Sequence, residues 1–287
     1  MIYIVITITL ILLYMKIETT FLSTSFVSFC SNSDGLKIVH LSDIHINKFY
    51  VSEAKLLTRL DRVKPDIVIM SGDYIETYRD IQKFIAFLTL LTKNYPVYLT
   101  FGNHDHKALY YNTNNKDGFI EKIEAAGGKV LLNSKLKILK NGIPYNLIGI
   151  DDLRKGKPDI RKALLGIEAS TVTGCINIVV SHNPDIIFDL PADKVDYLLC
   201  GHFHGGQIWM PFNIEFKLMR KEKLCRMKCF RGLHKVNGIN LYINRGLGNV
   251  IFPFRFLSTP EIAVIQLPGG TVTNSEDKQS INQKQKL

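Results

Sequence analysis

Five short runs of mostly apolar, β-branched residues are each followed at once by a polar cluster, and this arrangement limits the folds open to the chain. The runs are residues 36–41, 67–70, 97–101, 176–180 and 195–200. Their length and composition predict buried strands. Helices are expected between the first three, over residues 52–62 with Ser52 as the N-cap and over residues 80–92. Strands alternating with helices predict a largely parallel sheet covered by helices.

The rest of the chain is less regular. Residues 106–118 are expected to form a loop, and a helix is expected over residues 119–126, ending at Gly127 and Gly128. Hairpin strands are expected around Asn141 and Gly142, in a second sheet. Residues 151–174 are predicted to be partly helical, with Asp151 and Asp152 in a solvated loop.

The polar clusters follow the carboxyl ends of the predicted strands, where open α/β sheets bind ligands. They supply seven candidate metal ligands: Asp43, His45, Asp73, Asn103, His182, His202 and His204. If strand geometry persists, residues i and i+2 point the same way, so Asp43 pairs with His45 and His202 with His204. Imidazole, carboxylate and amide ligands together suit Mn, Fe, Zn or Co. Seven ligands exceed the needs of one ion and fit two ions that share a carboxylate.

In chain order, these clusters resemble the DxH, GD, GNH[DE], H and GHxH motifs of the calcineurin-like metallophosphoesterases, over residues 35–267. The resemblance implies an α/β fold, a four-layer αββα sandwich of two mixed β-sheets flanked by helices. It implies two divalent ions, Mn²⁺ foremost, with Fe, Zn or Co as alternatives. One ion would be held by Asp43, His45, Asp73 and His204, and the other by Asp73, Asn103, His182 and His202. His104 would face the phosphate and assist the leaving oxygen.

Two divalent ions lower the pKa of a shared water and offset phosphoryl charge, so no side-chain nucleophile is required. His104 can then donate a proton to the leaving oxygen. Glu76 is a candidate to orient His104, with a surface role as the alternative. Arg245, in a Gly-rich turn, is a candidate phosphate ligand, with a structural ion pair as the alternative.

Further stretches resemble the membrane-associated bacterial branch of this superfamily. They are residues 35–38, 41–43, 181–185, 205–207, 244–248 and 260–262. That branch contains phosphodiesterases and the UDP-2,3-diacylglucosamine pyrophosphatases of lipid A synthesis. The resemblance implies a phosphorylated amphipathic or nucleotide substrate. The alternatives are a general phosphodiesterase or phosphatase acting on a soluble substrate, and a non-catalytic scaffold. A scaffold is disfavoured because all seven ligands are present.

Residues 2–15 are apolar apart from Thr7 and Thr9, and Lys16 follows. As a helix they would span about 21 Å, less than the ~30 Å hydrocarbon core of a bilayer. Three interpretations stay open: a short anchor, a membrane-lying segment, or a first strand. Residues 17–29 are expected to form a strand. The predicted division is an apolar segment over residues 1–16, a metallophosphoesterase domain over 17–267 and a disordered tail over 268–287.

The chain carries a formal charge of +10, which favours nucleic acid, anionic lipid or phosphorylated ligands as partners. No nucleic-acid-binding pattern is present, so no nucleic acid is expected. Residues 210–235 mix eight Lys or Arg with apolar residues and two Glu. This mixture predicts contact with an anionic membrane, with a solvated loop that has ordinary core anchors as the alternative. Arg220 and Lys221 are candidate substrate-binding residues.

The expected location is the cytoplasmic face of the cell membrane, with the cytoplasm as second choice. Lys16 after the apolar segment supports it, as do five cysteines without a CxxC pair, which favour reduced thiols. Cys175 and Cys200 are expected in the core, and a metal pair of Cys225 and Cys229 is the lesser interpretation. The sequence does not predict an oligomeric state.

Overall fold

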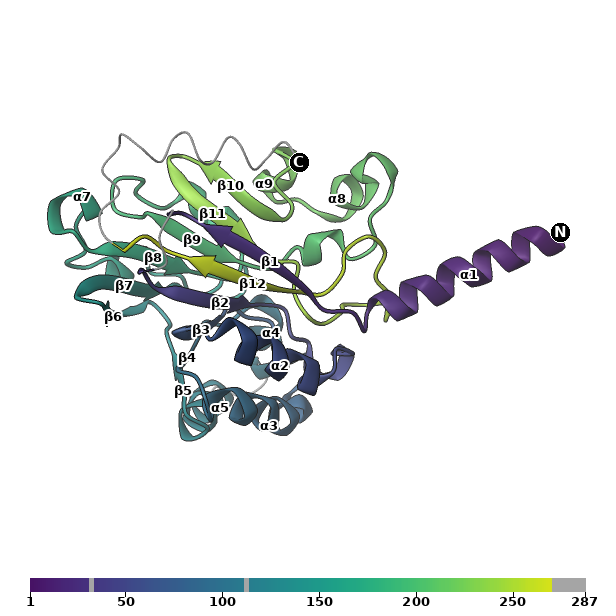
Figure 1. The fold of residues 1–287 in the computed structure, drawn as a ribbon, viewed down its shortest axis with the longest axis horizontal. Coiled ribbons are helices and arrows are strands. Elements are labelled where there is room, and N and C mark those ends of the chain that lie inside the picture. Colours follow the sequence, from purple (N-terminus) through teal and green to yellow (C-terminus); the bar gives the residue numbers. More distant parts are fainter. Residues whose placement is uncertain (31–33, 111–113, 270–287) are drawn as a thin grey trace.

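The computed structural model describes residues 1–30, 34–110 and 114–269. The predicted disordered tail lies outside the described residues from position 270 onward. Two six-stranded sheets lie face to face, with helices on both outer faces (Figure 1). The expected four-layer sandwich is therefore confirmed.

The first sheet has the strand order β1-β12-β2-β3-β4-β5. Its strands are β1 (Ser23–Ser28), β2 (Lys37–Leu41), β3 (Ile67–Met70), β4 (Val97–Leu99), β5 (Gly128–Val130) and β12 (Glu261–Gln266). All neighbouring pairs are parallel except β12 with β2. The carboxyl ends of β2, β3 and β4 therefore meet at one edge.

The second sheet has the order β10-β11-β9-β8-β7-β6. Its strands are β6 (Ser134–Lys140), β7 (Ile143–Gly149), β8 (Ile176–Val180), β9 (Tyr197–Cys200), β10 (Gly232–Val236) and β11 (Ile239–Ile243). The expected hairpin at Asn141 and Gly142 joins antiparallel β6 and β7, and β8 and β9 run parallel between two antiparallel edge pairs.

The helices cover the outer faces. They are α2 (Glu53–Val63), α3 (Ile81–Thr92), α4 (Asn103–Leu109), α5 (Asn114–Ala125), α6 (Ile160–Ala163), α7 (Ser170–Thr173), α8 (Ile214–Met219) and α9 (Lys223–Arg226). Short 3-10 turns are Ile46–Lys48, Tyr78–Asp80, Pro184–Phe188, His204–Gly206 and Pro211–Asn213. Ser52 caps α2 as predicted, accepting from the Lys55 N–H. The expected loop over residues 106–118 is wrong in part, because α4 and the start of α5 occupy it.

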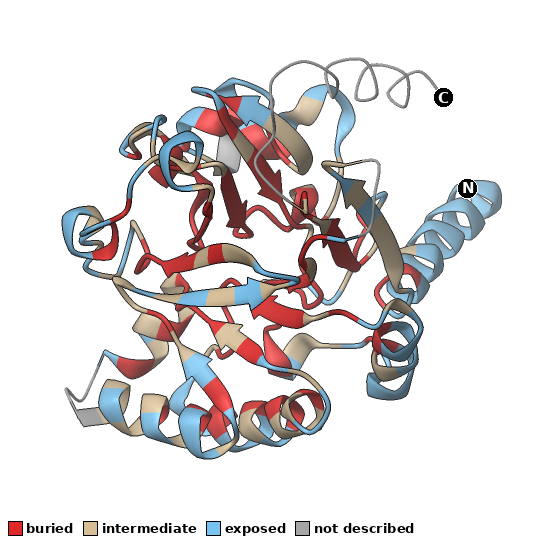
Figure 2. Ribbon diagram, turned by 60° about the vertical axis from the view of Figure 1, so that its left-hand side comes forward, coloured by how far each residue is buried: buried red, intermediate tan, exposed pale blue. Residues whose placement is uncertain are grey.

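Side chains on alternate strand positions enter different cores. Val39 and Leu41 pack under the helices of the first sheet, whereas Ile38 packs between the sheets against residues that include Ile178 and Leu199. Burial on both faces explains why these strands are continuous apolar runs in the sequence. Figure 2 shows the buried residues concentrated in the two sheets.

The N-terminal segment is a helix, α1 (Ile2–Glu18), which projects from the sandwich and is exposed over most of its length (Figures 1 and 2). The first-strand interpretation of residues 2–15 is therefore wrong, and the strand expected over 17–29 is confined to β1. The Thr7 and Thr9 hydroxyls donate to carbonyls one turn earlier, which accommodates these β-branched residues in a helix. No helix in the described ranges combines the length and the apolar character needed to cross a membrane.

Candidate metal centre

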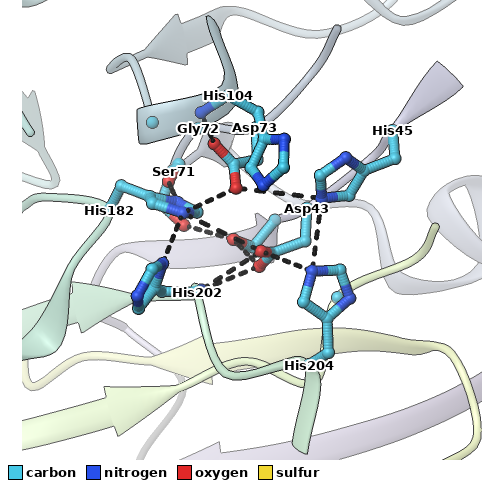
Figure 3. Close-up of polar contacts among 12 residues, drawn as sticks. Asp43, His45, Ser71, Gly72, Asp73, His104, His182, His202 and His204 are labelled. Atoms are coloured by element: carbon cyan, nitrogen blue, oxygen red, sulfur yellow. Dashed lines mark hydrogen bonds and ion pairs between the residues drawn. The ribbon is translucent and has the colours of Figure 1, made fainter. Parts of the chain in front are cut away.

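Six of the seven predicted ligands gather where the carboxyl ends of the two sheets meet (Figure 3). One cluster holds Asp43, His45 and His204, and the other holds Asp73, His182 and His202. Within each cluster, the ligand atoms lie within 4.8 Å of one another. Each cluster unites residues that follow strands of both sheets, so the face-to-face packing of the sheets creates the site.

The Asp73 carboxylate lies between the two clusters. Its Oδ2 is 2.9 Å from His182 Nε2 and 3.8 Å from His45 Nε2. In the first cluster, His45 Nε2 lies 3.2 Å from His204 Nε2. In the second, His202 Nδ1 lies 3.2 Å from His182 Nε2. Asp73 thus occupies the position that a bridging ligand requires.

Asn103, the seventh predicted ligand, is the first residue of α4. Its Oδ1 is buried, and the described part of the chain offers it no hydrogen-bond partner. A buried acceptor without a partner is costly, and a cation would satisfy it. With the converging imidazole nitrogens, this atom makes the donor set fit divalent ions of borderline softness. The groups suggest a binuclear site.

The backbone at the ligands is not that of a strand. Asp43, His45, Asp73, His202 and His204 have φ of 49°, 40°, 58°, 75° and 52°. The expected i, i+2 strand geometry is therefore wrong, because β2 ends at Leu41 and β9 at Cys200. Left-handed turns aim these side chains inward instead. Asp and His tolerate this region better than most residues, at a cost of order 1–3 kcal/mol each.

Two glycines allow backbone and side chains to approach closely at the site. A Cβ at Gly102 would collide with the Asp73 carboxylate, and one at Gly201 would collide with Ser42 and Asp43. These two positions therefore require glycine for steric reasons.

Asp105 holds the turn that carries Asp73, a role that the sequence interpretation missed. Its buried carboxylate accepts the N–H groups of Asp73, Tyr74 and Ile75 at 2.8, 2.8 and 3.1 Å, and that of Gly102 at 2.8 Å. Burial, with the nearby Asp73 charge, raises the pKa of Asp105 to about 6. The signal in the sequence was the acidic residue at the last position of the GNH[DE] motif, three residues after Gly102.

Glu76 contacts two imidazoles. Its Oε2 lies 2.8 Å from His104 Nδ1, as predicted, and its Oε1 lies 2.6 Å from His45 Nδ1. Burial lowers the pKa of His104. The hydrogen bond with Glu76 and the charge of Asp73 outweigh this effect, so the pKa of His104 is raised above its usual value. The His104 side chain is 25% exposed. It is thus oriented, favoured in its protonated form and accessible to a ligand.

Glu222 contacts a histidine of the second cluster, as Glu76 contacts His45 in the first. The sequence interpretation missed this role too. Its Oε1 lies 3.0 Å from His202 Nε2 and 3.0 Å from Arg154 Nη1. Burial lowers the pKa of His202 to about 3, which keeps the ring neutral as a metal ligand must be. Glu222 is one of only two acids in the basic stretch 210–235, and that exception was the available signal.

The stretch 210–235 is anchored in the core, as its solvated-loop alternative expected, but it is partly helical. Its α8 and α9 contribute buried Phe216 and Leu224 to the core of the second sheet, and Phe230, which follows α9, packs there too. Cys225 and Cys229 lie in the same core as free thiols. Burial raises the pKa of Cys225 to about 12, which disfavours a thiolate metal ligand. Cys175 and Cys200 are buried as predicted.

The three candidate substrate residues differ in their contacts. Arg220 donates through Nη2 to the His202 carbonyl at 2.9 Å. Lys221 is exposed next to Glu222. Arg245 Nε lies 2.6 Å from Glu261 Oε2, which matches the alternative of a structural ion pair. Only Arg220 touches a candidate ligand through its side chain.

Asp151 and Asp152 are buried, so their placement in a solvated loop is wrong. Asp151 Oδ1 lies 2.5 Å from His106 Nε2. Asp152 Oδ2 accepts the N–H groups of Arg154 and Lys155. The two carboxylates therefore order the start of the connecting segment and join it to α4.

The sequence profile described as "Calcineurin-like phosphoesterase" matches residues 36–206. The chain belongs to this family. It is 33% identical to the uncharacterised metallophosphoesterase YkoQ of Bacillus subtilis (strain 168), over 81% of this chain and 83% of that protein. It is 28% identical to the phosphodiesterase YaeI of Escherichia coli (strain K12), over 83% and 84% of the two chains.

Identity falls to 26% with LpxG of Chlamydia trachomatis serovar D, a UDP-2,3-diacylglucosamine pyrophosphatase, over 81% of this chain and 83% of that one. The resemblance found in the motifs is confirmed. The family and its phosphodiesterase member make this chain a phosphoesterase, a hydrolase with a binuclear divalent metal site.

Proposed function

We propose that this phosphoesterase uses two Mn²⁺ ions to hydrolyse a phosphoester or pyrophosphate bond in a membrane-associated, amphipathic substrate. The observation that carries the metal assignment is the Asp73 carboxylate between the two ligand clusters. Asp43, His45, Asp73 and His204 would hold one ion, and Asp73, Asn103, His182 and His202 the other. When bound, two such ions would lower the pKa of a water molecule and offset phosphoryl charge.

The remaining steps belong to residues of this chain. His104 donates a proton to the leaving oxygen, because Glu76 fixes its Nδ1 and leaves Nε2 for the substrate. Arg220, held on the His202 carbonyl, meets a phosphate oxygen on the second cluster's side. Glu76 and Glu222 keep His45 and His202 in the orientations that the ions require.

Two features support a substrate at the membrane. α1 exposes apolar side chains such as Ile4 and Leu13, and Lys217, Lys221 and Lys223 are exposed on the basic stretch. Apolar and basic surface together favour the headgroup region of an anionic leaflet. We place the enzyme at the cytoplasmic face of the membrane. One relative, LpxG, is a UDP-2,3-diacylglucosamine pyrophosphatase. We therefore propose UDP-2,3-diacylglucosamine, an intermediate of lipid A synthesis, as the first substrate to test.

The test is a comparison of kcat/KM for UDP-2,3-diacylglucosamine, bis(4-nitrophenyl) phosphate and a phosphopeptide with Mn²⁺ present. The proposal expects the diacylated substrate to be preferred, with no turnover of any substrate by Asp73→Asn. A preference for the soluble diester would make this a general phosphodiesterase. Absence of turnover in fully metal-loaded wild-type protein would make it a scaffold.

A further inference from the structure

We propose that an apolar pocket beside the metal centre binds a hydrocarbon chain of the substrate, and that a buried carboxylate in this pocket accepts a hydrogen bond from a hydroxyl or amide on that chain. The inference rests on the proposed function, because it assigns a site to the apolar part of the substrate whose phosphate meets the ions.

The pocket and the metal centre share a wall. A cavity of about 120 Å³ is lined by side chains that include Phe203, Ile208, Met210, Phe216 and Phe252. That volume is several times the roughly 10–15 Å³ that one water needs. His204 and Arg220 also line it. A ligand with its phosphate at His204 can therefore extend an attached chain into the pocket without leaving the protein surface.

One polar atom in the pocket has no hydrogen-bond partner among the described residues. Glu215 is buried, and its Oε2 accepts the Met210 N–H at 3.1 Å. Within the described ranges, its Oε1 is buried and has no hydrogen-bond partner. An unpaired acceptor among apolar side chains is costly, and a donor on the ligand would remove that cost. A plain alkyl chain has no such donor, whereas a hydroxylated or amide-linked chain has one.

The pocket opens among exposed apolar side chains. Ile251 and Phe252 line it and are 65% and 56% exposed. Ile251 has φ of 55°, a conformation in which a β-branched residue is an outlier, although Asn or Gly would adopt it more readily. An apolar side chain kept there despite this cost is consistent with contact with an apolar ligand.

The same loop is attached to α1. The Arg255 N–H donates to the Met15 carbonyl at 3.2 Å, and the ring centroids of Phe256 and Tyr14 lie 6.0 Å apart. Buried Glu18 accepts the N–H groups of Leu257 and Ser258. Figure 1 shows α1 and α8 on the same side of the sandwich. A hydrocarbon chain that leaves a bilayer in contact with α1 would therefore meet the opening of the pocket.

The sequence contains one tryptophan, Trp209, whose ring centroid lies 5.9 Å from that of the pocket residue Phe216. Its fluorescence reports on the pocket without turnover. Full-length, chelator-treated protein is titrated with dodecyl phosphate, butyl phosphate and inorganic phosphate, below the micelle concentration. We expect dodecyl phosphate to bind at least about tenfold more tightly than butyl phosphate, which two buried methylene groups suffice to give. Equal affinities would overturn the proposal.

Variants locate the effect. Phe252→Asp should reduce the preference for the long chain at least about fivefold, whereas Val172→Asp, at an exposed site on α7, should leave it unchanged. A 2-hydroxydodecyl phosphate should bind more tightly than dodecyl phosphate in wild type, and Glu215→Leu should abolish that difference. Thermal melting verifies that each variant is folded. Loss of chain preference in Val172→Asp, or a hydroxyl effect that survives Glu215→Leu, would contradict the assignment.

Hydrolysis separates this inference from the proposed function. With Mn²⁺, the ratio of kcat/KM between long- and short-chain diesters should exceed one in wild type and fall in Phe252→Asp. A ratio of one with active enzyme refutes the pocket and leaves the hydrolase. No hydrolysis by metal-loaded protein refutes the proposed function, and the fluorescence titration still decides the pocket. If Phe252→Asp weakens only sedimentation with phosphatidylglycerol vesicles, the loop contacts the bilayer and the chain site is refuted.

Discussion

The metal centre and the apolar face beside it are built in opposite ways. At the centre, the candidate ligands Asp43, His45 and His182 are fully buried, and carboxylates outside this set hold the candidate ligands or their loops. The apolar face, formed by α1, the loop 250–257 and the pocket, exposes large apolar side chains, and its pocket contains a carboxylate oxygen without a hydrogen-bond partner among the described residues. The side chains of the centre hold one another in place, whereas the apolar side chains of the face stay exposed until a partner covers them.

This contrast divides the molecule by task. A site that performs one reaction must hold its ligands in fixed positions, and the left-handed turns at five ligands show that the fold tolerates strain to do so. A surface that receives an apolar partner needs area and access. Changes at the centre should therefore affect every substrate, and changes at the face should affect only amphipathic ones.

The largest effect is expected at the shared carboxylate and its neighbour. Asp73→Asn and His202→Ala should nearly abolish turnover of every substrate, since each removes a ligand on which the metal pair depends. Circular dichroism should show that the fold persists, because the three core clusters do not include these residues. Full activity in either variant would remove the binuclear mechanism.

A smaller loss is expected at His104. His104→Ala should lower kcat by about 10²- to 10⁴-fold, the range for a general acid, while metal content measured by mass spectrometry stays at the wild-type level. His234→Ala, at a histidine on β10, is the matched control and should retain activity. Loss of metal from His104→Ala would show that this residue is a ligand.

Glu222 tests the comparison between the metal centre and the apolar face, because it lies in the basic stretch 210–235 but contacts His202 of the centre. Glu222→Gln should weaken Mn²⁺ binding by about 10- to 100-fold, since it removes the charge that orients His202. Competition with a chelator measures the affinity, and Glu121→Gln at an exposed position of α5 serves as control. Unchanged affinity would leave Glu222 as a structural partner of Arg154.

The smallest effects are expected at the membrane face. Deleting residues 1–15 should weaken sedimentation with phosphatidylglycerol vesicles. Reversing Lys217, Lys221 and Lys223 to Glu should weaken it further, at about 1 kcal/mol per well-placed charge. Arg220 is left unchanged in this triple variant because its side chain contacts His202 of the metal centre. The same net change made at three lysines that are exposed elsewhere, Lys83, Lys129 and Lys137, should have little effect. Equal losses of vesicle binding in both triple variants would show that binding depends only on the net charge of the protein.

The sequence predicted the centre far better than its surroundings. Seven candidate ligands could be named, six of which the structure brings together, because each motif joins a short strand to a polar cluster, and this local pattern can be recognised without knowledge of the fold. Glu222 and Asp105 could not be found in the same way. Glu222 reaches His202 across 20 residues of chain. Asp105 fills the last position of the GNH[DE] motif, but its bonds to backbone N–H groups depend on a turn that only the fold reveals.

The predicted backbone geometry also failed for a physical reason. Alternation along a strand predicts Asp43 and His45 on one side, but the chain leaves β2 at Leu41 and brings the two side chains together by left-handed turns. The N-terminal segment is rich in Ile and Thr, which favour strands. Composition could not reveal that it would have no sheet partner and would form α1.

The measurement that tests the central claim most directly is electron paramagnetic resonance of the chelated protein during titration with Mn²⁺. Two ions that share Asp73 should be exchange-coupled, so the spectrum at two ions per chain should show a coupled pair, and hydrolysis should appear with that signal. Asp73→Asn should lose both. Binding of a single uncoupled ion, or full turnover in chelated protein, would contradict the account.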